Sequence, residues 1–162
     1  MTRIACMTVA LAIGASGAAL AQQAPSAAAS PGAPATYKTN TELAAAIKKA
    51  AEARPDMSSA NVKSSDRYQI NVVRRGKAAG AIAHANGTEL HHIMEGSGTL
   101  VTGGVIVRQT AEGGTAVIQG GESRHVVKGD VILIPENTPH WYKDVDGSIT
   151  YLEVRFNITP QK

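Results

Sequence analysis

Residues 84–96 read His84-Ala85-Asn86-Gly87-Thr88-Glu89-Leu90-His91-His92-Ile93-Met94-Glu95-Gly96, and residues 129–140 read Gly129-Asp130-Val131-Ile132-Leu133-Ile134-Pro135-Glu136-Asn137-Thr138-Pro139-His140. In both stretches, turn residues border an extended apolar or alternating run. Side chains two apart in a strand face the same side, so Glu89 and His91 share one face and His92 lies on the other. The two stretches therefore predict strands that bring titratable side chains to one side of a sheet.

The chain around these stretches reads as many short strands. We predict strands at 68–75, 78–84, 89–94, 99–102, 105–109, 115–119, 123–127, 131–134, 141–144 and 149–158. Asn-Gly, Gly-Gly and Asp-Gly pairs separate several of them, which is the chemistry of tight turns. Short strands at regular spacing predict a sandwich or jelly roll closed into a barrel.

One helix is expected before the strands. Thr39 and Glu42 have the spacing of a capping box, Leu43 and Ile47 lie on one narrow apolar stripe, and Pro55 ends the pattern. We expect this helix to pack on the outside of the domain or on a partner subunit.

The N-terminus has the pattern of a secretory signal peptide. Arg3 precedes an uncharged, mostly apolar run that ends in small residues at Ala21. Cleavage there would leave 141 residues, the size of one domain, and would remove Cys6, the only cysteine. We therefore predict a signal peptide at 1–21, a flexible Ala/Pro/Ser linker at 22–37, a helix with its connection at 38–60 and a barrel at 61–162. This division implies a periplasmic or secreted protein without stable membrane insertion; the alternative is a retained N-terminal anchor.

Composition excludes several function classes. The formal net charge is only +3 and aromatic residues make up 4% of the chain, which argues against a nucleic-acid partner. No serine nucleophile elbow is present, and the mature chain would have no cysteine nucleophile. A metal ion or a His/Glu acid–base pair would have to carry any reaction.

Together the two stretches resemble the paired signature motifs of the cupin superfamily, in particular small single-domain bacterial cupins. The intervals from His84 to Glu89 and from Glu89 to Gly96 fit the first motif. In the second motif the matching positions are Gly129, Pro135 and His140, with Asn137 in place of the usual glycine. The resemblance covers roughly residues 68–156. It implies an all-β fold, a double-stranded β-helix (jelly-roll) barrel with one short N-terminal helix.

The resemblance also implies a metal site. His84, Glu89 and His140 fall on ligand positions of the family, whereas Ile82 stands where the first histidine belongs and cannot ligate a metal. By strand alternation we predict that His91 points inward as well, as a fourth ligand or as a general base. Imidazole and carboxylate ligands suit a divalent transition metal such as iron, manganese, nickel, copper or zinc.

The resemblance leaves two functions open. The first is a metal-dependent enzyme of the dioxygenase, isomerase, lyase or cyclase type, which acts on a small oxygenated molecule in the barrel pocket. The alternative is a non-catalytic cupin that binds a small ligand and has lost its metal, and Ile82 favours it. Cupins commonly pair through their sheets, so the resemblance also implies a homodimer.

The last strand alternates between two faces. We predict that the apolar face is buried and that Tyr151, Glu153 and Arg155 lie on a solvated exterior. The alternative places this polar face in the cavity, where Arg155 would hold an anionic substrate. His92 and His125 are predicted to be exposed.

Overall fold

The computed structural model describes residues 32–108 and 114–157. Within them lie one helix and eight strands: α1 (Asn40–Ala53), β1 (Met57–Ser64), β2 (Tyr68–Arg75), β3 (Thr88–Thr102), β4 (Val105–Arg108), β5 (Ala116–Gln119), β6 (Glu122–Val127), β7 (Val131–Ile134) and β8 (His140–Phe156). The predicted signal peptide and the linker up to residue 31 lie outside the described residues. No helix in the described part of the chain is long and apolar enough to cross a membrane.

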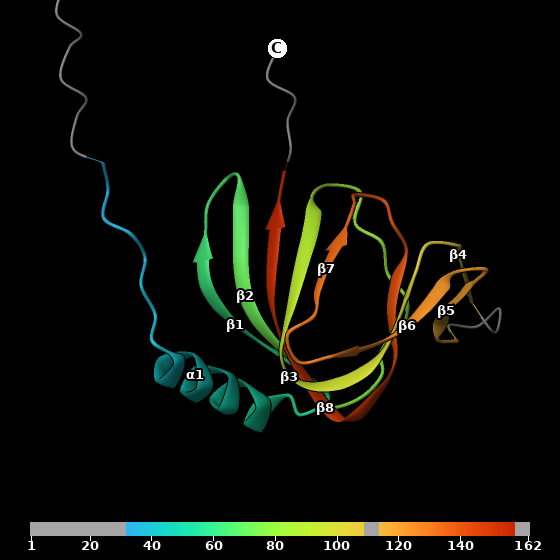
Figure 1. Ribbon diagram of the computed structural model, residues 1–162, viewed down its shortest axis with the longest axis horizontal. Coiled ribbons are helices and arrows are strands. Elements are labelled where there is room, and N and C mark those ends of the chain that lie inside the picture. Colours follow the sequence, from blue (N-terminus) through green and yellow to red (C-terminus); the bar gives the residue numbers. More distant parts are fainter. Residues whose placement is uncertain (1–31, 109–113, 158–162) are drawn as a thin grey trace, which may run out of the picture. The chain divides into compact units, whose positions relative to one another are not determined.

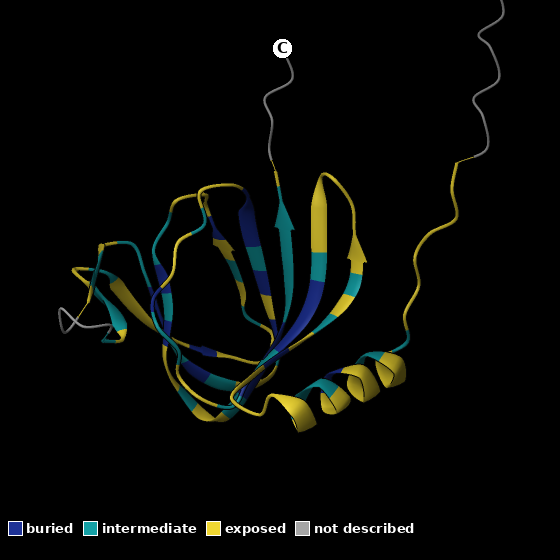
Figure 2. Cartoon of the chain, turned by 180° about the vertical axis from the view of Figure 1, so that it is seen from behind, coloured by how far each residue is buried: buried dark blue, intermediate teal, exposed yellow. Residues whose placement is uncertain are grey.

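Helix α1 begins with the predicted capping box. The Thr39 hydroxyl accepts a hydrogen bond from the backbone N–H of Glu42, and the Glu42 carboxylate accepts one from the backbone N–H of Thr39. Only Ile47 of the helix is fully buried, so the rest of α1 faces solvent or lines a cleft of about 530 Å³ against the outer face of the sheet. Figure 2 shows the mainly exposed surface of this helix.

The strands form one strongly curved antiparallel sheet and a separate hairpin. The order is β1-β2-β8-β3-β6, with β7 also paired to β3, while β4 pairs with β5. The first half of β3 lies between β7 and β8, and its second half lies between β6 and β8. The long strands β3 and β8 pair with each other along most of their length and bend together. The sheet therefore folds over on itself as a barrel-like double layer (Figure 1). The predicted all-β fold with one short N-terminal helix is confirmed.

Two long strands replace four predicted short ones. The runs at 89–94 and 99–102 are one strand, β3, and those at 141–144 and 149–158 are joined in β8 as far as Phe156. Register shifts between Ile93 and Glu95 and between Gly96 and Gly98 bend β3 without ending its pairing. β-Bulges of this kind look like strand ends in a sequence because glycine interrupts the apolar pattern.

The strand predictions were wrong for the segment before β2 and for the segment after it. Strand β1 was missed because Met57–Ser64 is mostly polar, and it forms the sheet edge where both faces are largely exposed. It also begins before the barrel boundary that we placed at residue 61. The predicted strand at 78–84 is an irregular connection in which Ile82 alone forms a bridge, to His140. A smaller difference concerns 115–119, of which 116–119 form β5; of the strand predicted at 105–109, residues 105–108 form β4 and residue 109 lies outside the described residues.

The inside of the barrel is partly polar. A buried apolar cluster of Val73, Ile93, Leu100, Val126, Tyr142, Ile149 and Tyr151 fills one part of it. Alongside are buried polar and charged residues: Asn71, Arg75, Glu89, His91 and His140. Figure 2 shows this buried band along the middle of the strands. Because buried charges are costly unless they are paired or bind an ion, the polar part marks the candidate site.

Candidate metal centre

Glu89 lies at the centre of the candidate site. Its side chain is 3% exposed, and both of its oxygens face nitrogen atoms. Oε1 accepts a hydrogen bond from Arg155 Nε at 2.8 Å, forms an ion pair with Nη2 at 2.6 Å and lies 3.1 Å from His84 Nε2. Oε2 lies 3.2 Å from His91 Nε2 and 3.5 Å from His140 Nε2. One carboxylate therefore joins four side chains from β3, β8 and the connection before β3.

His140 is held with one ring nitrogen ready to bind a cation. Its Nδ1 lies 3.0 Å from the carbonyl oxygen of Thr138, and because a carbonyl only accepts, Nδ1 carries the proton. Burial lowers the pKa of His140 below its ordinary value, so the ring is neutral at pH 7. Its Nε2 then presents a lone pair toward Glu89. A backbone acceptor on the other nitrogen is the usual way in which a ligating histidine is oriented.

His84 presents a second imidazole lone pair. It lies in the connection between β2 and β3 with 31% of its side chain exposed. Its Nε2 is 3.0 Å from Arg155 Nη2, a donor, and 3.1 Å from Glu89 Oε1, an acceptor; with the ring proton on Nδ1, Nε2 accepts from the guanidinium. One ligand atom from each of His84, Glu89 and His140 lies within 4.8 Å of the others. The three residues that the motif spacing singled out thus converge on one point.

His91 is buried and faces inward, but it supports Glu89 from a different side. Its Nε2 faces the Glu89 carboxylate and its Nδ1 lies 3.2 Å from the hydroxyl of Tyr142. Because the carboxylate needs a donor, Nε2 carries the proton and Nδ1 accepts from the Tyr142 hydroxyl. Burial raises the pKa of Tyr142, so this phenol remains a neutral donor. Among the described residues His91 belongs to a second potential ligand group, with Glu89 and Glu153.

Glu89 is ionised in this setting. Burial by itself would raise its pKa, but the hydrogen bond from His91 and the charges around the carboxylate, that of Arg155 among them, outweigh burial and lower the pKa to about 2. The site therefore offers one negative carboxylate and two imidazoles, a set of donors that suits a divalent transition metal.

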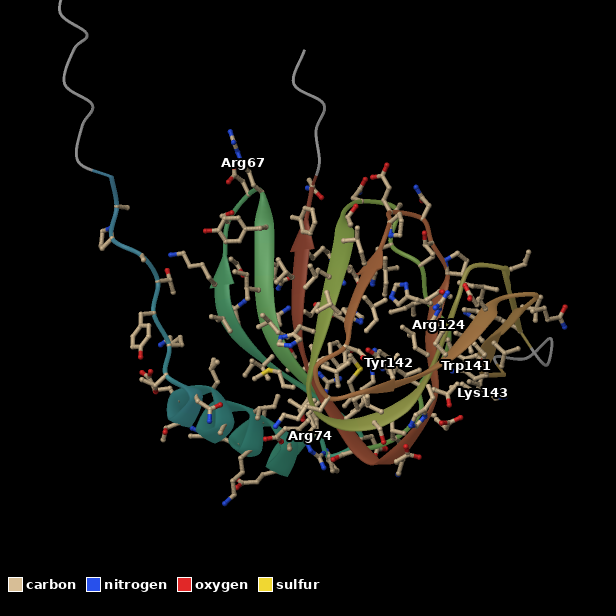
Figure 3. All side chains as sticks on the ribbon, viewed as in Figure 1. Arg67, Arg74, Arg124, Trp141, Tyr142 and Lys143 are labelled. Atoms are coloured by element: carbon tan, nitrogen blue, oxygen red, sulfur yellow. The ribbon has the colours of Figure 1, made fainter. Side chains whose placement is uncertain are left out.

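Stacked aromatic rings lie next to His91, and the sequence analysis did not predict them. The rings of Tyr142 and Tyr151 stack with centroids 5.2 Å apart, and Tyr151 lies 4.5 Å from the His91 ring. Arg75 donates from Nε to the Tyr151 hydroxyl over 3.0 Å and lies above the Tyr142 ring. Burial raises the pKa of Tyr151 to about 12. Figure 3 shows Tyr142 inside the barrel, whereas Arg67 points away at the β1–β2 turn.

The predicted exterior position of Tyr151, Glu153 and Arg155 is wrong. Tyr151 is fully buried, Glu153 accepts a hydrogen bond from Asn71 over 3.2 Å, and Arg155 binds Glu89. The barrel interior is polar along this strand, so the apolar face of Leu152 and its neighbours is the outer one. The same alternation would have placed Arg155 correctly if the polar face had been matched to Glu89 on β3.

The predictions for the remaining histidines are confirmed. His92 and His125 are both exposed. The 530 Å³ cleft beside α1 contains none of the cluster residues. We place the candidate site at the cluster because converging donors, and not volume, define a metal site.

Comparison with known proteins gives likeness at the level of fold. No family model matches the chain, and no curated protein matches it. Among solved structures it is similar to a cupin superfamily protein of Desulfitobacterium hafniense (17% identity, TM-score 0.42, covering 62% of this chain and 77% of the other). It is also similar to EutQ of Clostridium difficile (13%, 0.44, 62% and 68%) and to the DMSP lyase DddQ of Ruegeria pomeroyi (16%, 0.48, 66% and 50%).

The two motifs occupy corresponding places in the structure. The first motif leads into β3 and the second connects β7 with β8, so that Glu89 and His140 meet inside the sheet although they are far apart in sequence. With these two motifs and an antiparallel jelly-roll sheet around them, the chain has the fold of the cupin superfamily.

Proposed function

We propose that His84, Glu89 and His140 hold one divalent transition metal ion and that the protein is a small metal-dependent enzyme. The observation that carries this proposal is the meeting of two imidazole lone pairs and one ionised carboxylate within 4.8 Å. When bound, an ion at such a site polarises a substrate oxygen or activates water or dioxygen. The substrate class we propose is a small oxygenated molecule.

The surrounding residues support this use of the site. The Glu89 carboxylate fixes the tautomer of His91, whose Nε2–H holds Oε2, and the Tyr142 hydroxyl donates to Nδ1 of the same ring. Thr138 fixes the ring of His140. His84 and Arg155 are about one third exposed, so the cluster is open to solvent on their side. A small molecule approaching from that side would first meet His84 and Arg155, because the side chains of Glu89 and His140 are only 3% and 4% exposed.

A second function has its own support. Ile82 is 39% exposed and supplies no ligand where the family has a histidine, and Arg155 already neutralises Glu89 without a metal ion. These two observations favour a non-catalytic barrel that binds a small organic ligand. The two functions differ in whether the purified protein contains a metal.

Elemental analysis separates them. The full chain, His140→Ala and His92→Ala would be purified without added metal or chelator and analysed for iron, manganese, nickel, copper and zinc. We expect close to one metal ion per chain in the wild type and in His92→Ala, and little in His140→Ala, with circular dichroism unchanged in all three. Equal metal content in wild type and His140→Ala would overturn the site; a metal-free wild type would favour the ligand-binding function.

We propose in addition that the protein is exported to the periplasm or secreted and that it forms a homodimer. Export is supported by the N-terminal pattern up to Ala21, and dimerisation by the family resemblance alone. The intact mass of the protein recovered from the host periplasm would reveal cleavage after Ala21, and light scattering in solution would give the number of chains.

A further inference from the structure

We propose that Arg155 is a built-in cation that competes with the metal ion for Glu89, and that, once displaced, it binds an anionic group of the substrate. This inference rests on the proposed metal site and names the class of substrate for it: a small molecule that carries a carboxylate or another oxyanion.

The first argument is the position of Arg155 Nη2. It lies 2.6 Å from Glu89 Oε1 and 3.0 Å from His84 Nε2, and these two atoms are themselves 3.1 Å apart. With the His84 ring proton on Nδ1, both atoms are lone-pair acceptors, and they would repel each other at this distance unless a positive group faced both. The guanidinium supplies that group. It therefore uses two of the lone pairs that we assign to the metal ion.

The second argument is that one carboxylate cannot serve both cations equally. Arg155 holds Oε1 through one charge-assisted hydrogen bond from Nε and an ion-pair contact from Nη2, and charge-assisted bonds are the stronger kind. A metal ion on Glu89 and His84 has to replace the Nη2 contacts with both residues. The wild-type protein therefore binds a metal ion more weakly than the same ligands would without Arg155.

The third argument concerns Arg155 after displacement. Within the part of the chain that the structure describes, Glu89 is its only carboxylate partner within 4.0 Å. The stem of Arg155 lies beside the turn at Gly87, where an added Cβ would be 3.1 Å from Arg155 Cγ, and 30% of the side chain is exposed. A half-buried guanidinium without a partner is costly. An oxyanion on a ligand beside the metal ion would restore the pairing.

The inference has a thermodynamic consequence. If metal entry frees Arg155 and an anion then binds to it, each of the two ligands must strengthen the binding of the other by the same factor. A barrel with these residues would select anionic molecules only when it is loaded with metal.

The test is a titration of the full metal-free chain with Co²⁺, followed by calorimetry and by the visible absorption of the bound ion. The titration is done with and without acetate at constant ionic strength. We expect Arg155→Met to bind Co²⁺ about 10-fold more tightly than wild type, because two charge-assisted contacts no longer oppose the metal. Acetate should tighten Co²⁺ binding in the wild type and have no effect in Arg155→Met. The matched control is Arg124→Met on β6, which removes an exposed arginine remote from Glu89.

Arg155→Lys is a control for a folding artefact, because lysine keeps the positive charge but cannot contact Glu89 and His84 as the guanidinium does. We expect the Co²⁺ affinity of Arg155→Lys to lie between those of wild type and Arg155→Met. Equal Co²⁺ affinity in wild type and both variants would overturn the inference and leave the metal site standing. Binding by Arg155→Met but not by wild type would support the competition and overturn a resident metal. Absence of binding in all variants would overturn both proposals. An acetate effect that persists in Arg155→Met would remove the anion-binding role.

Discussion

The backbone N–H of Asn137 donates a hydrogen bond to the carbonyl oxygen of His84 over 2.7 Å, which ties the loop of the second motif to the first. Asn137 is also the one non-glycine residue with a positive φ, 61°, among the described residues. Asparagine tolerates this left-handed conformation better than other non-glycine residues. The side chain that departs from the family's glycine is therefore one that can adopt the same turn.

This turn gives the first prediction. Asn137→Gly should change the free energy of unfolding by only a few tenths of a kcal/mol, whereas Asn137→Val should lower it by about 1–2 kcal/mol because a β-branched residue is strained at positive φ. Urea unfolding followed by circular dichroism measures both. Equal stability of the two variants would mean that the turn relaxes and that the tie to His84 is weak.

The hydroxyl of Tyr142 gives the second prediction. Tyr142→Phe leaves Nδ1 of the buried His91 without its donor, and we expect a loss of about 1–3 kcal/mol in the free energy of unfolding. Tyr37→Phe is the matched control, because Tyr37 is 80% exposed and should change stability by less than about 0.5 kcal/mol. Chemical unfolding of both variants measures the two losses in the free energy of unfolding. A loss no larger than that of the control would show that water replaces the hydroxyl.

Two glycines with the same backbone angle give the third prediction. Gly96 and Gly103 both have a φ of 74°, but a Cβ at Gly96 would lie 1.9 Å from the carbonyl oxygen of Ser148, whereas one at Gly103 would meet nothing within 4 Å. We expect Gly103→Ala to cost about 1 kcal/mol for the strained φ, and Gly96→Ala to cost about 3 kcal/mol or more because β8 must move. Thermal unfolding of the pair measures the difference. Similar costs would show that the strands separate easily at the bulge.

The capping box gives the fourth prediction. Thr39→Ala removes the acceptor for the backbone N–H of Glu42 and should destabilise α1 by about 1 kcal/mol, while Thr39→Ser should retain most of the effect. Because only Ile47 of α1 is fully buried, we expect local opening of the helix. Hydrogen exchange of the α1 amides is the measurement. Protection unchanged in Thr39→Ala would mean that contacts with the sheet, and not the cap, hold the helix.

The sequence predicted the fold and part of the site for clear physical reasons. Turn residues and strand alternation are local, so they indicated most strands, placed His91 inward and placed His92 outward. The intervals of the two motifs identified His84, Glu89 and His140, which converge in the structure. The capping box of α1 was found because its two residues are only three apart.

The side-chain contacts that the sequence could not predict are those between strands that are paired but far apart in the chain. Arg155 contacts Glu89 because the two residues are register partners in β8 and β3, a pairing that joins positions far apart in the chain. Arg75 of β2 reaches Tyr151 of β8 diagonally, since the register partner of Tyr151 is Val73. Strand β1 has too little apolar pattern to be recognised, since an edge strand needs few buried side chains.

The central position of β8 has a consequence for how the chain folds during synthesis. Both β2 and β3 pair with β8, which is the last strand of the described chain to be made. Until Phe156 has left the ribosome, β2 can pair only with β1, and the first half of β3 only with β7; the pairings of both with β8 are distant in sequence. The barrel is therefore expected to stay open until synthesis of the described chain is nearly complete, and to close only when β8 joins β2 to β3.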